Sequence, residues 1–88
     1  MRLDKFLKVS RIIKRRTEAK NACLARCIAV NGRIAKAGDE IKIGDKLEID
    51  FNVKLLEVKV INVPVKNIPA EKASSLYEII REIKKEED

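Results

Sequence analysis

The residues of this 88-residue chain that could do chemistry are chiefly lysines and arginines near its N-terminus. Residues 1–36 hold eleven basic and two acidic side chains, a balance of +9, whereas residues 37–88 have a balance of −3. Clustered positive charge binds phosphates and other anions. The asymmetry predicts that one face of the fold meets a polyanion. Two weaker interpretations are that the charge only keeps the protein soluble, or that this face lies on an anionic membrane.

Other chemistries find little support. The chain has no His, which excludes His-based acid–base catalysis and most zinc sites. Cys23 and Cys27 could supply two thiolates to a metal, but only carboxylates remain as further ligands. We expect both thiols to be reduced, with Cys23 as a small core residue and Cys27 covering a helix end. Three glycines in separate turns make no phosphate loop, so we predict no enzyme, no metal and no cofactor.

The length limits the chain to one domain, and the apolar fraction of 45% suffices for a core. No apolar run approaches the 18–20 residues of a membrane span, and no signal peptide is recognisable. We therefore expect a cytoplasmic binding protein without a membrane partner.

Two helices must position the cations. Residues 3–9 form the first, because Leu3, Phe6 and Leu7 recur at i, i+3 and i+4. Asp4 lies near its start, where a carboxylate complements the helix dipole. Residues 17–26 form the second helix, with Ala19 on its apolar side together with Ala22, Cys23 and Leu24. Cations surround the N-terminal end of this second helix, where free N–H groups also attract phosphate.

A small sheet follows the helices. Asn31-Gly32 between apolar residues is a strong hairpin signal. Alternation in residues 46–51 predicts a strand with Leu47, Ile49 and Phe51 inward, and residues 53–63 predict a longer one. Residues 71–87 read as a final helix, with Leu76, Tyr77, Ile80 and Ile83 at helical spacing. The predicted fold is α+β, with two N-terminal helices, a small antiparallel sheet and a C-terminal helix.

Four stretches together resemble the RNA-binding domain named after ribosomal small-subunit protein four, the S-four domain. They are Arg2-Leu3-Asp4-Lys5-Phe6-Leu7, Arg11-Ile12-Ile13-Lys14-Arg15-Arg16-Thr17-Glu18-Ala19, Val30-Asn31-Gly32-Arg33 and Ile43-Gly44-Asp45. The match covers residues 1–51 in order and spacing. The first stretches are more similar still to the small, free-standing S-four proteins of bacterial ribosome-associated quality control, relatives of heat-shock protein fifteen.

The resemblance implies the S-four (alpha-L motif) fold over residues 1–63, with a linker and C-terminal helix in residues 64–88. It implies a monomeric, non-enzymatic factor of the large ribosomal subunit that binds 23S rRNA and peptidyl-tRNA on obstructed subunits and supports nascent-chain tailing by a partner factor. Matching the motifs residue by residue places Arg2, Arg11, Lys14, Arg15 and Arg16 on the RNA-facing helices and their connection, and we expect Lys5, Lys8 and Lys20 to be outer RNA contacts.

Two departures from the family pattern stand out. The family usually has Gly at position 27, so Cys27 must accept strain or the helix must end differently. Arg15 stands where a Ser or Thr often caps the second helix. Two alternatives to the quality-control function remain: a protein-interaction adaptor that uses the basic face, and a general binder of structured RNA.

Overall fold

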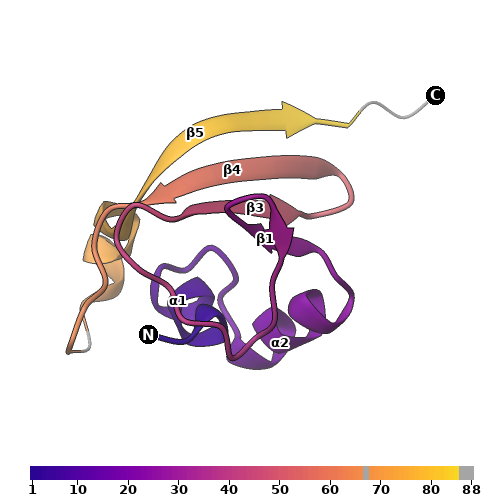
Figure 1. The fold of residues 1–88 in the computed structure, drawn as a ribbon. Coiled ribbons are helices and arrows are strands. Elements are labelled where there is room, and N and C mark those ends of the chain that lie inside the picture. The colour runs from indigo at the N-terminus through magenta and orange to yellow at the C-terminus, as the bar shows by residue number, and fades with distance from the viewer. Residues whose placement is uncertain (67, 86–88) are drawn as a thin grey trace.

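The computed structural model describes residues 1–66 and 68–85. Two helices come first, α1 (Leu3–Val9) and α2 (Arg16–Leu24). They are followed by β1 (Ile28–Val30), β2 (Arg33–Ile34), β3 (Lys46–Asp50), β4 (Lys54–Val60), the 3-10 helix η1 (Ala70–Leu76) and β5 (Tyr77–Lys84). The strands form one antiparallel sheet in the order β2-β1-β3-β4-β5, and α1 and α2 lie against one of its faces (Figure 1). This arrangement confirms the predicted α+β class.

The core lies between the two helices and the sheet. Leu3, Phe6 and Leu7 of α1 are fully buried, as their spacing predicts, and Ala19 and Cys23 are the buried residues of α2. Removing such apolar side chains from water supplies most of the stability of a fold this small. The sheet contributes its inward-facing side chains to the same core: Ile28, Leu47, Ile49, Leu56, Val58 and Val60.

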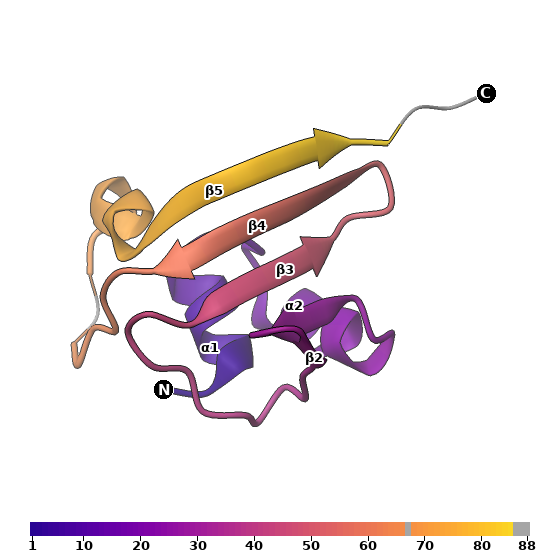
Figure 2. The same cartoon turned by 45° about the horizontal axis from the view of Figure 1, so that its top comes forward.

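Short turns join two of the strand pairs of the sheet, β1–β2 and β3–β4. Asn31 and Gly32 both have positive φ, 52° and 83°, which confirms the predicted hairpin between β1 and β2. β3 pairs along its whole length with β4, and the two strands lie side by side in Figure 2. Leu47 and Ile49 of β3 are buried in the core, and the side chains that alternate with them point to the opposite face of the sheet. Lys46 and Lys59 are directly opposite one another on that outer face. Phe51, predicted to point inward, lies just past β3 and is half-buried.

The predicted C-terminal helix over residues 71–87 is wrong for most of its length. Only Ala70–Leu76 is helical, as the short 3-10 helix η1, and the chain from Tyr77 to Lys84 is the strand β5. β5 pairs antiparallel with β4 and forms one edge of the sheet. Residues 86–87 of the predicted helix lie outside the described residues. Ile80 and Ile83 are consequently exposed rather than part of the core.

The way in which α2 ends explains how the chain accommodates Cys27. Two backbone hydrogen bonds close the helix: Arg26 N–H donates to the carbonyl of Cys23, and Cys27 N–H donates to the carbonyl of Ala22. This pattern is a Schellman motif, in which the residue before Cys27 takes the left-handed conformation. Arg26 has φ of 61°, so the helix ends one residue earlier than a glycine at position 27 implies and Cys27 escapes the strain. Both cysteines are free, with Cys23 buried and Cys27 half-buried.

Candidate nucleic-acid interface

All eight residues predicted to bind RNA have exposed side chains on the helical part of the molecule. Arg2 directly precedes α1, α1 carries Lys5 and Lys8, the connection between the helices carries Arg11, Lys14 and Arg15, and α2 carries Arg16 and Lys20. The two acids of residues 1–36 differ from each other, because Asp4 is buried while Glu18 is exposed. The surface of this segment is therefore more cationic than its composition indicates.

The connection between α1 and α2 is held at both ends. Ser10 is buried and its hydroxyl donates to the carbonyl of Leu7 at 3.2 Å. Arg11 follows with φ of 62°, and its N–H donates to the carbonyl of Lys8 at 3.0 Å. Ile13 is buried and its N–H donates to the carbonyl of Leu7. These contacts turn the chain sharply and leave the cations of the connection on its outer side.

The N-terminus of α2 lacks a side-chain cap. Arg15 is the N-cap residue and makes no capping hydrogen bond, which confirms that this position gives up the cap. The first N–H groups of a helix have no partner within the helix and carry the positive end of its dipole. With Arg15 and Arg16 beside them, these groups form a surface suited to phosphate oxygens.

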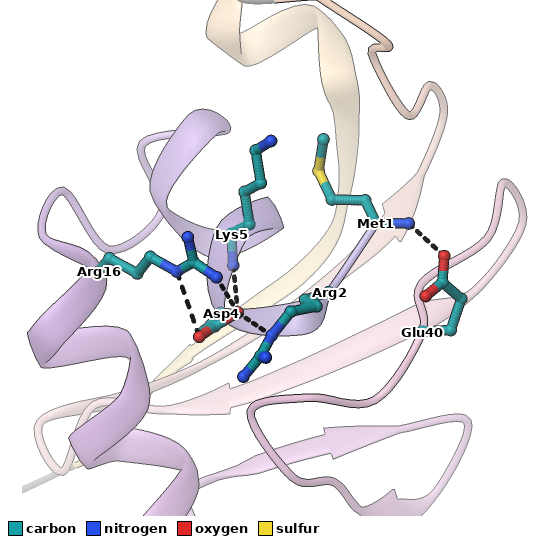
Figure 3. Close-up of polar contacts among 6 residues, drawn as sticks. All are labelled: Met1, Arg2, Asp4, Lys5, Arg16 and Glu40. Atoms are coloured by element: carbon teal, nitrogen blue, oxygen red, sulfur yellow. Dashed lines mark hydrogen bonds and ion pairs between the residues drawn. The ribbon is translucent and has the colours of Figure 1, made fainter.

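A buried carboxylate joins two of the predicted cations. Asp4 has 0% exposure and receives hydrogen bonds from Arg2 and Arg16, which stand at the starts of α1 and α2 (Figure 3). Arg2 Nε donates to Asp4 Oδ1 at 3.2 Å. Arg16 donates through Nε to Oδ2 at 3.3 Å and through Nη2 to Oδ1 at 3.4 Å. The backbone N–H of Lys5 completes the shell at 2.8 Å from Oδ1.

These contacts keep Asp4 ionised despite its burial. Burial by itself raises the pKa of a carboxyl group, because the charged form loses its hydration. Here the hydrogen bonds from Arg16 and from the Lys5 N–H, together with the charges of Arg16 and Arg2, hold the pKa of Asp4 below its usual value. The cluster of Arg2, Asp4 and Arg16, which we call the Asp4 cluster, is thus two guanidinium groups around one carboxylate.

Residues 37–41, in the connection between β2 and β3, support the Asp4 cluster. The N–H groups of Leu3 and Asp4 donate to the carbonyls of Asp39 and Ala37, so this segment satisfies free donors at the start of α1. The backbone of Arg2 pairs in antiparallel fashion with the backbone of Glu40. The carboxylate of Glu40 also forms an ion pair with the N-terminal amine (Figure 3). A Cβ atom at Gly38 would lie 3.6 Å from Nη2 of Arg2. The guanidinium of Arg2 therefore rests close to the backbone of this segment.

The other predicted cations are not brought into this cluster. Only the backbone of Lys5 contacts Asp4, and its side chain runs away from the carboxylate (Figure 3). Lys8 and Arg11 instead line a shallow hollow of about 190 Å³ with Ile68 and Ala70. Within residues 1–66 and 68–85, no ion pair involves Lys5, Lys8, Arg11, Lys14 or Lys20.

The sequence did not identify two features of this surface. The first is the role of Asp4, for which the only sequence signal is a single acid inside a basic run. The second is an open hollow of about 500 Å³ between the end of α2 and β2, with Arg26 and Lys36 in its lining. Leu24, predicted to face the core, is 81% exposed and lines this hollow instead. The Schellman turn after Leu24 explains its position, because the chain leaves the helix there.

Neither a metal site nor a membrane-spanning helix was found in the part of the chain that the structure describes. Its Cys, Asp and Glu side chains do not gather in any group of three or more that could hold a metal ion. None of its helices has the length and apolar character needed to cross a bilayer.

Comparison with known proteins relates this surface to a family. A family model of the S4 domain matches residues 1–47, which include α1, α2 and the β1–β2 hairpin. The matched part holds all eight predicted RNA-binding residues and the Asp4 cluster.

Relatives extend the similarity to nearly the whole chain. The RQC P-site tRNA stabilizing factor of Halalkalibacterium halodurans is 55% identical over 93% of this chain and 92% of that protein. The factor of the same name from Streptococcus pneumoniae is 50% identical over 100% of this chain and 99% of that protein. Among solved structures, a trimeric structure of heat shock protein 15 from Vibrio cholerae has a TM-score of 0.82 and 25% identity, covering 90% of this chain and 80% of that one.

Proposed function

Because this chain belongs to the S4 domain family, we propose that it binds structured RNA through α1, α2 and their connection, and that it acts in ribosome-associated quality control. The RNA is 23S rRNA together with the peptidyl-tRNA held on an obstructed large subunit. By holding that tRNA in the P-site position, the protein supports tailing of the nascent chain by a partner factor.

One observation carries this proposal. Eight exposed cations lie on α1, α2 and their connection, and two of them are fixed by a buried carboxylate. Phosphate contacts supply most of the affinity for folded RNA, which proteins recognise largely by shape. The relatives that are 50% and 55% identical over nearly the whole chain, both named RQC P-site tRNA stabilizing factor, support the choice of tRNA and ribosome as partners.

The proposed factor acts by binding alone. We propose that it is a cytoplasmic monomer with no catalytic step, in which residues 1–63 bind RNA and residues 64–88 form a linker and the C-terminal element. The aromatic content agrees with this target, because modules that read single strands stack bases on exposed aromatic rings. Phe6 is fully buried, and Tyr77 and Phe51 are half-buried against the core.

Sedimentation of a cell lysate through a sucrose gradient tests the proposal. We expect the protein to co-migrate with large subunits at moderate salt and to leave them as salt rises. Enrichment on large subunits that retain peptidyl-tRNA, compared with empty ones, separates the quality-control function from general binding of structured RNA. A peak only at the top of the gradient contradicts the proposal and favours the adaptor alternative.

Charge variants locate the surface. Neutralising Lys14 and Arg15 together (Lys14→Gln/Arg15→Gln) should weaken large-subunit binding about tenfold and lower the log–log salt slope by roughly 1–2, since each lost phosphate contact removes nearly one unit. Both side chains are exposed, and the one ion pair between them and the rest of the chain is Arg15–Glu18 at 4.0 Å in the described residues. We therefore expect little change in thermal unfolding.

Lys46→Gln/Lys59→Gln is the matched control. It removes the same charge from the outer face of the sheet, away from α1 and α2. This control should bind like the wild type, because contacts and not net charge set the affinity. Equal weakening by both double variants indicates attraction by net charge alone and contradicts the assigned surface.

A further inference from the structure

Asp4 is the feature of this surface that simple electrostatics does not explain. A carboxylate among cations lowers the positive potential that attracts a polyanion. Surface ion pairs add little stability, and Arg2 and Arg16 are 52% and 42% exposed. The carboxylate itself has no exposed surface, so it is placed beneath the two arginines and cannot touch RNA.

We propose that Asp4 is a positioning residue of the RNA-binding surface, which holds the guanidinium groups of Arg2 and Arg16 side by side in the orientation that binds phosphate. The inference rests on the proposed function and deepens it. It assigns the recognition of RNA phosphates to a fixed pair of arginines rather than to independent flexible cations.

The N–H donors that Arg2 and Arg16 leave free support this role. A guanidinium group has five N–H donors, one on Nε and two on each terminal nitrogen. Arg2 uses Nε towards Asp4, and among the described residues neither of its terminal nitrogens has a side-chain partner. Arg16 uses Nε and Nη2, which leaves Nη1. Arg2 is therefore anchored through Nε and Arg16 through Nε and Nη2, while other N–H groups of both remain for the fork-like binding of phosphate oxygens.

The surroundings of the Asp4 cluster fix the pair further. The carboxylate sits in the first turn of α1, where its oxygen accepts the Lys5 N–H and its own N–H donates to the carbonyl of Ala37. On the other side, the guanidinium of Arg2 lies beside Gly38, where an added Cβ atom would be 3.6 Å from Nη2. Holding a long side chain before binding removes an entropy cost that a free lysine or arginine must meet on binding.

Positioning and simple electrostatics predict opposite signs for Asp4→Asn. Removing a negative charge near a polyanion site strengthens binding if only charge matters. If Asp4 orients the two arginines, the same change weakens binding, because Asn cannot hold two guanidinium groups as an ionised carboxylate does. We expect about tenfold weaker binding to large subunits.

Glu18→Gln is the matched control. Glu18 is the other acid of residues 1–36, lies on α2 and is exposed, so its loss changes charge without releasing the Asp4 cluster. It should leave binding unchanged or make it up to about threefold tighter. A folded Asp4→Asn protein that binds as tightly as the wild type, or tighter, overturns the inference.

A second pair of variants keeps the test valid if Asp4→Asn fails to fold. Arg2→Lys and Arg16→Lys keep the net charge and the attraction to Asp4, but an ammonium cannot hold the carboxylate and fork onto phosphate at once. The inference predicts about fivefold to tenfold weaker binding for each at unchanged charge. Wild-type affinity in both variants overturns it.

Nitrogen-15 NMR of the arginine Nε–H groups separates this inference from the proposed function. In the free wild-type protein, the Nε–H signals of Arg2 and Arg16 should be protected from exchange with water, and Asp4→Asn should abolish that protection. If the signals are protected but the wild type does not bind large subunits, the proposed function fails and the paired arginines stand. If the signals exchange freely in the wild type, the positioning role is contradicted whatever the protein binds.

Discussion

Two arginines occupy backbone positions that usually favour glycine. Arg11 follows α1 with φ of 62° and Arg26 follows α2 with φ of 61°. The left-handed conformation costs an L-residue about 1–2 kcal/mol relative to its preferred backbone. At both arginines the protein accepts this cost and gains an exposed cation, next to the hollows that Arg11 and Arg26 line. Because Arg26 takes the left-handed conformation after α2, Cys27 does not have to, and it can stand where the family usually has glycine.

Arg15 shows a similar conflict between charge and stability. As the uncapped N-cap residue of α2, it leaves the first N–H groups of the helix without a side-chain partner. Arg15→Ser supplies a cap and should stabilise the protein by about 1 kcal/mol, or roughly 4–8 °C in melting temperature. The loss of one cation should weaken large-subunit binding about threefold to fivefold. Thermal unfolding by circular dichroism and a binding isotherm measure the two effects.

Arg15→Ala is the control for this prediction. It removes the same cation without adding a cap, so it should weaken binding as much as Arg15→Ser but leave the melting temperature near the wild-type value. If the serine variant is no more stable than the alanine variant, the N-cap position of Arg15 is wrong.

The sequence predicted the exposure of the eight cations but not how two of them are held. Lysine and arginine stay at the surface because burying an unpaired charge costs free energy. The exposure of a basic segment can therefore be predicted from its sequence. The burial of Asp4 depends on Arg16, twelve residues later, reaching it across the packed pair α1 and α2. Spacing along the chain carries no signal for a contact that tertiary packing creates.

At the scale of elements, local signals predicted α1, the hairpin and β4 but failed at β5. α1 has the predicted bounds because three apolar residues mark one helical face. In Tyr77–Lys84 the same spacing is present, yet Ile79, Ile80 and Ile83 are β-branched and suit a strand. The unpaired edge of β4 decides between the two. It offers a ladder of hydrogen bonds from Lys54 to Val60 that is interrupted by one register shift between Glu57 and Val58, and Arg81 and Glu57 form an ion pair of 2.7 Å across it.

Alanine substitutions in β5 have opposite signs for a strand and a helix. Ile80 and Ile83 are 43% and 44% exposed, so replacing them removes little core packing. In a helix, alanine is the better residue and stability should rise by a few tenths of a kcal/mol per site. In a strand, each change should lower stability by about 0.5–1 kcal/mol. We expect the loss, measured by urea unfolding of Ile80→Ala and Ile83→Ala.

Asn21→Ala on the exposed side of α2 calibrates that measurement. Asn21 lies in a helix of nine residues, where alanine should raise stability by roughly 0.5 kcal/mol. Stabilisation by alanine at all three positions means that the β5 segment behaves as a helix.

For the whole molecule, the fold separates two kinds of charge. Its helical side carries the predicted RNA-binding cations, whereas part of the sheet's charge is paired locally in the ion pairs Lys54–Glu82, Arg81–Glu57 and Lys85–Asp50. Each of these ion pairs attracts a polyanion less than an unpaired cation does. The separation gives the molecule a direction in which it approaches RNA.

Acid should unfold the protein through its paired carboxylates. The pKa of Asp4 is lowered in the folded state from an ordinary value of 3.8, and those of Glu40 and Asp50 are lowered by the N-terminal amine and by Lys85. A lowered folded-state pKa means that the stabilisation is complete above the unfolded-state value and is lost as pH falls through the folded-state value. We expect the free energy of unfolding, measured with urea, to fall steadily between about pH 5 and pH 2.

Asp4→Asn should flatten this dependence, because it removes the one fully buried carboxylate of the three. If it folds, its stability should change less than that of the wild type over the same range. An identical slope in both proteins shows that Asp4 does not carry the acid sensitivity.

The place of β5 also determines the order in which the fold can be completed during synthesis. All contacts among α1, α2 and β1 to β4 lie within the first 60 residues, whereas β5 begins at Tyr77. A chain that leaves the ribosome N-terminus first can therefore assemble its helical pair and four strands before the last strand emerges. During that interval the edge of β4 is an open template for pairing with another nascent chain. The speed with which the final segment follows should thus influence the yield of native protein.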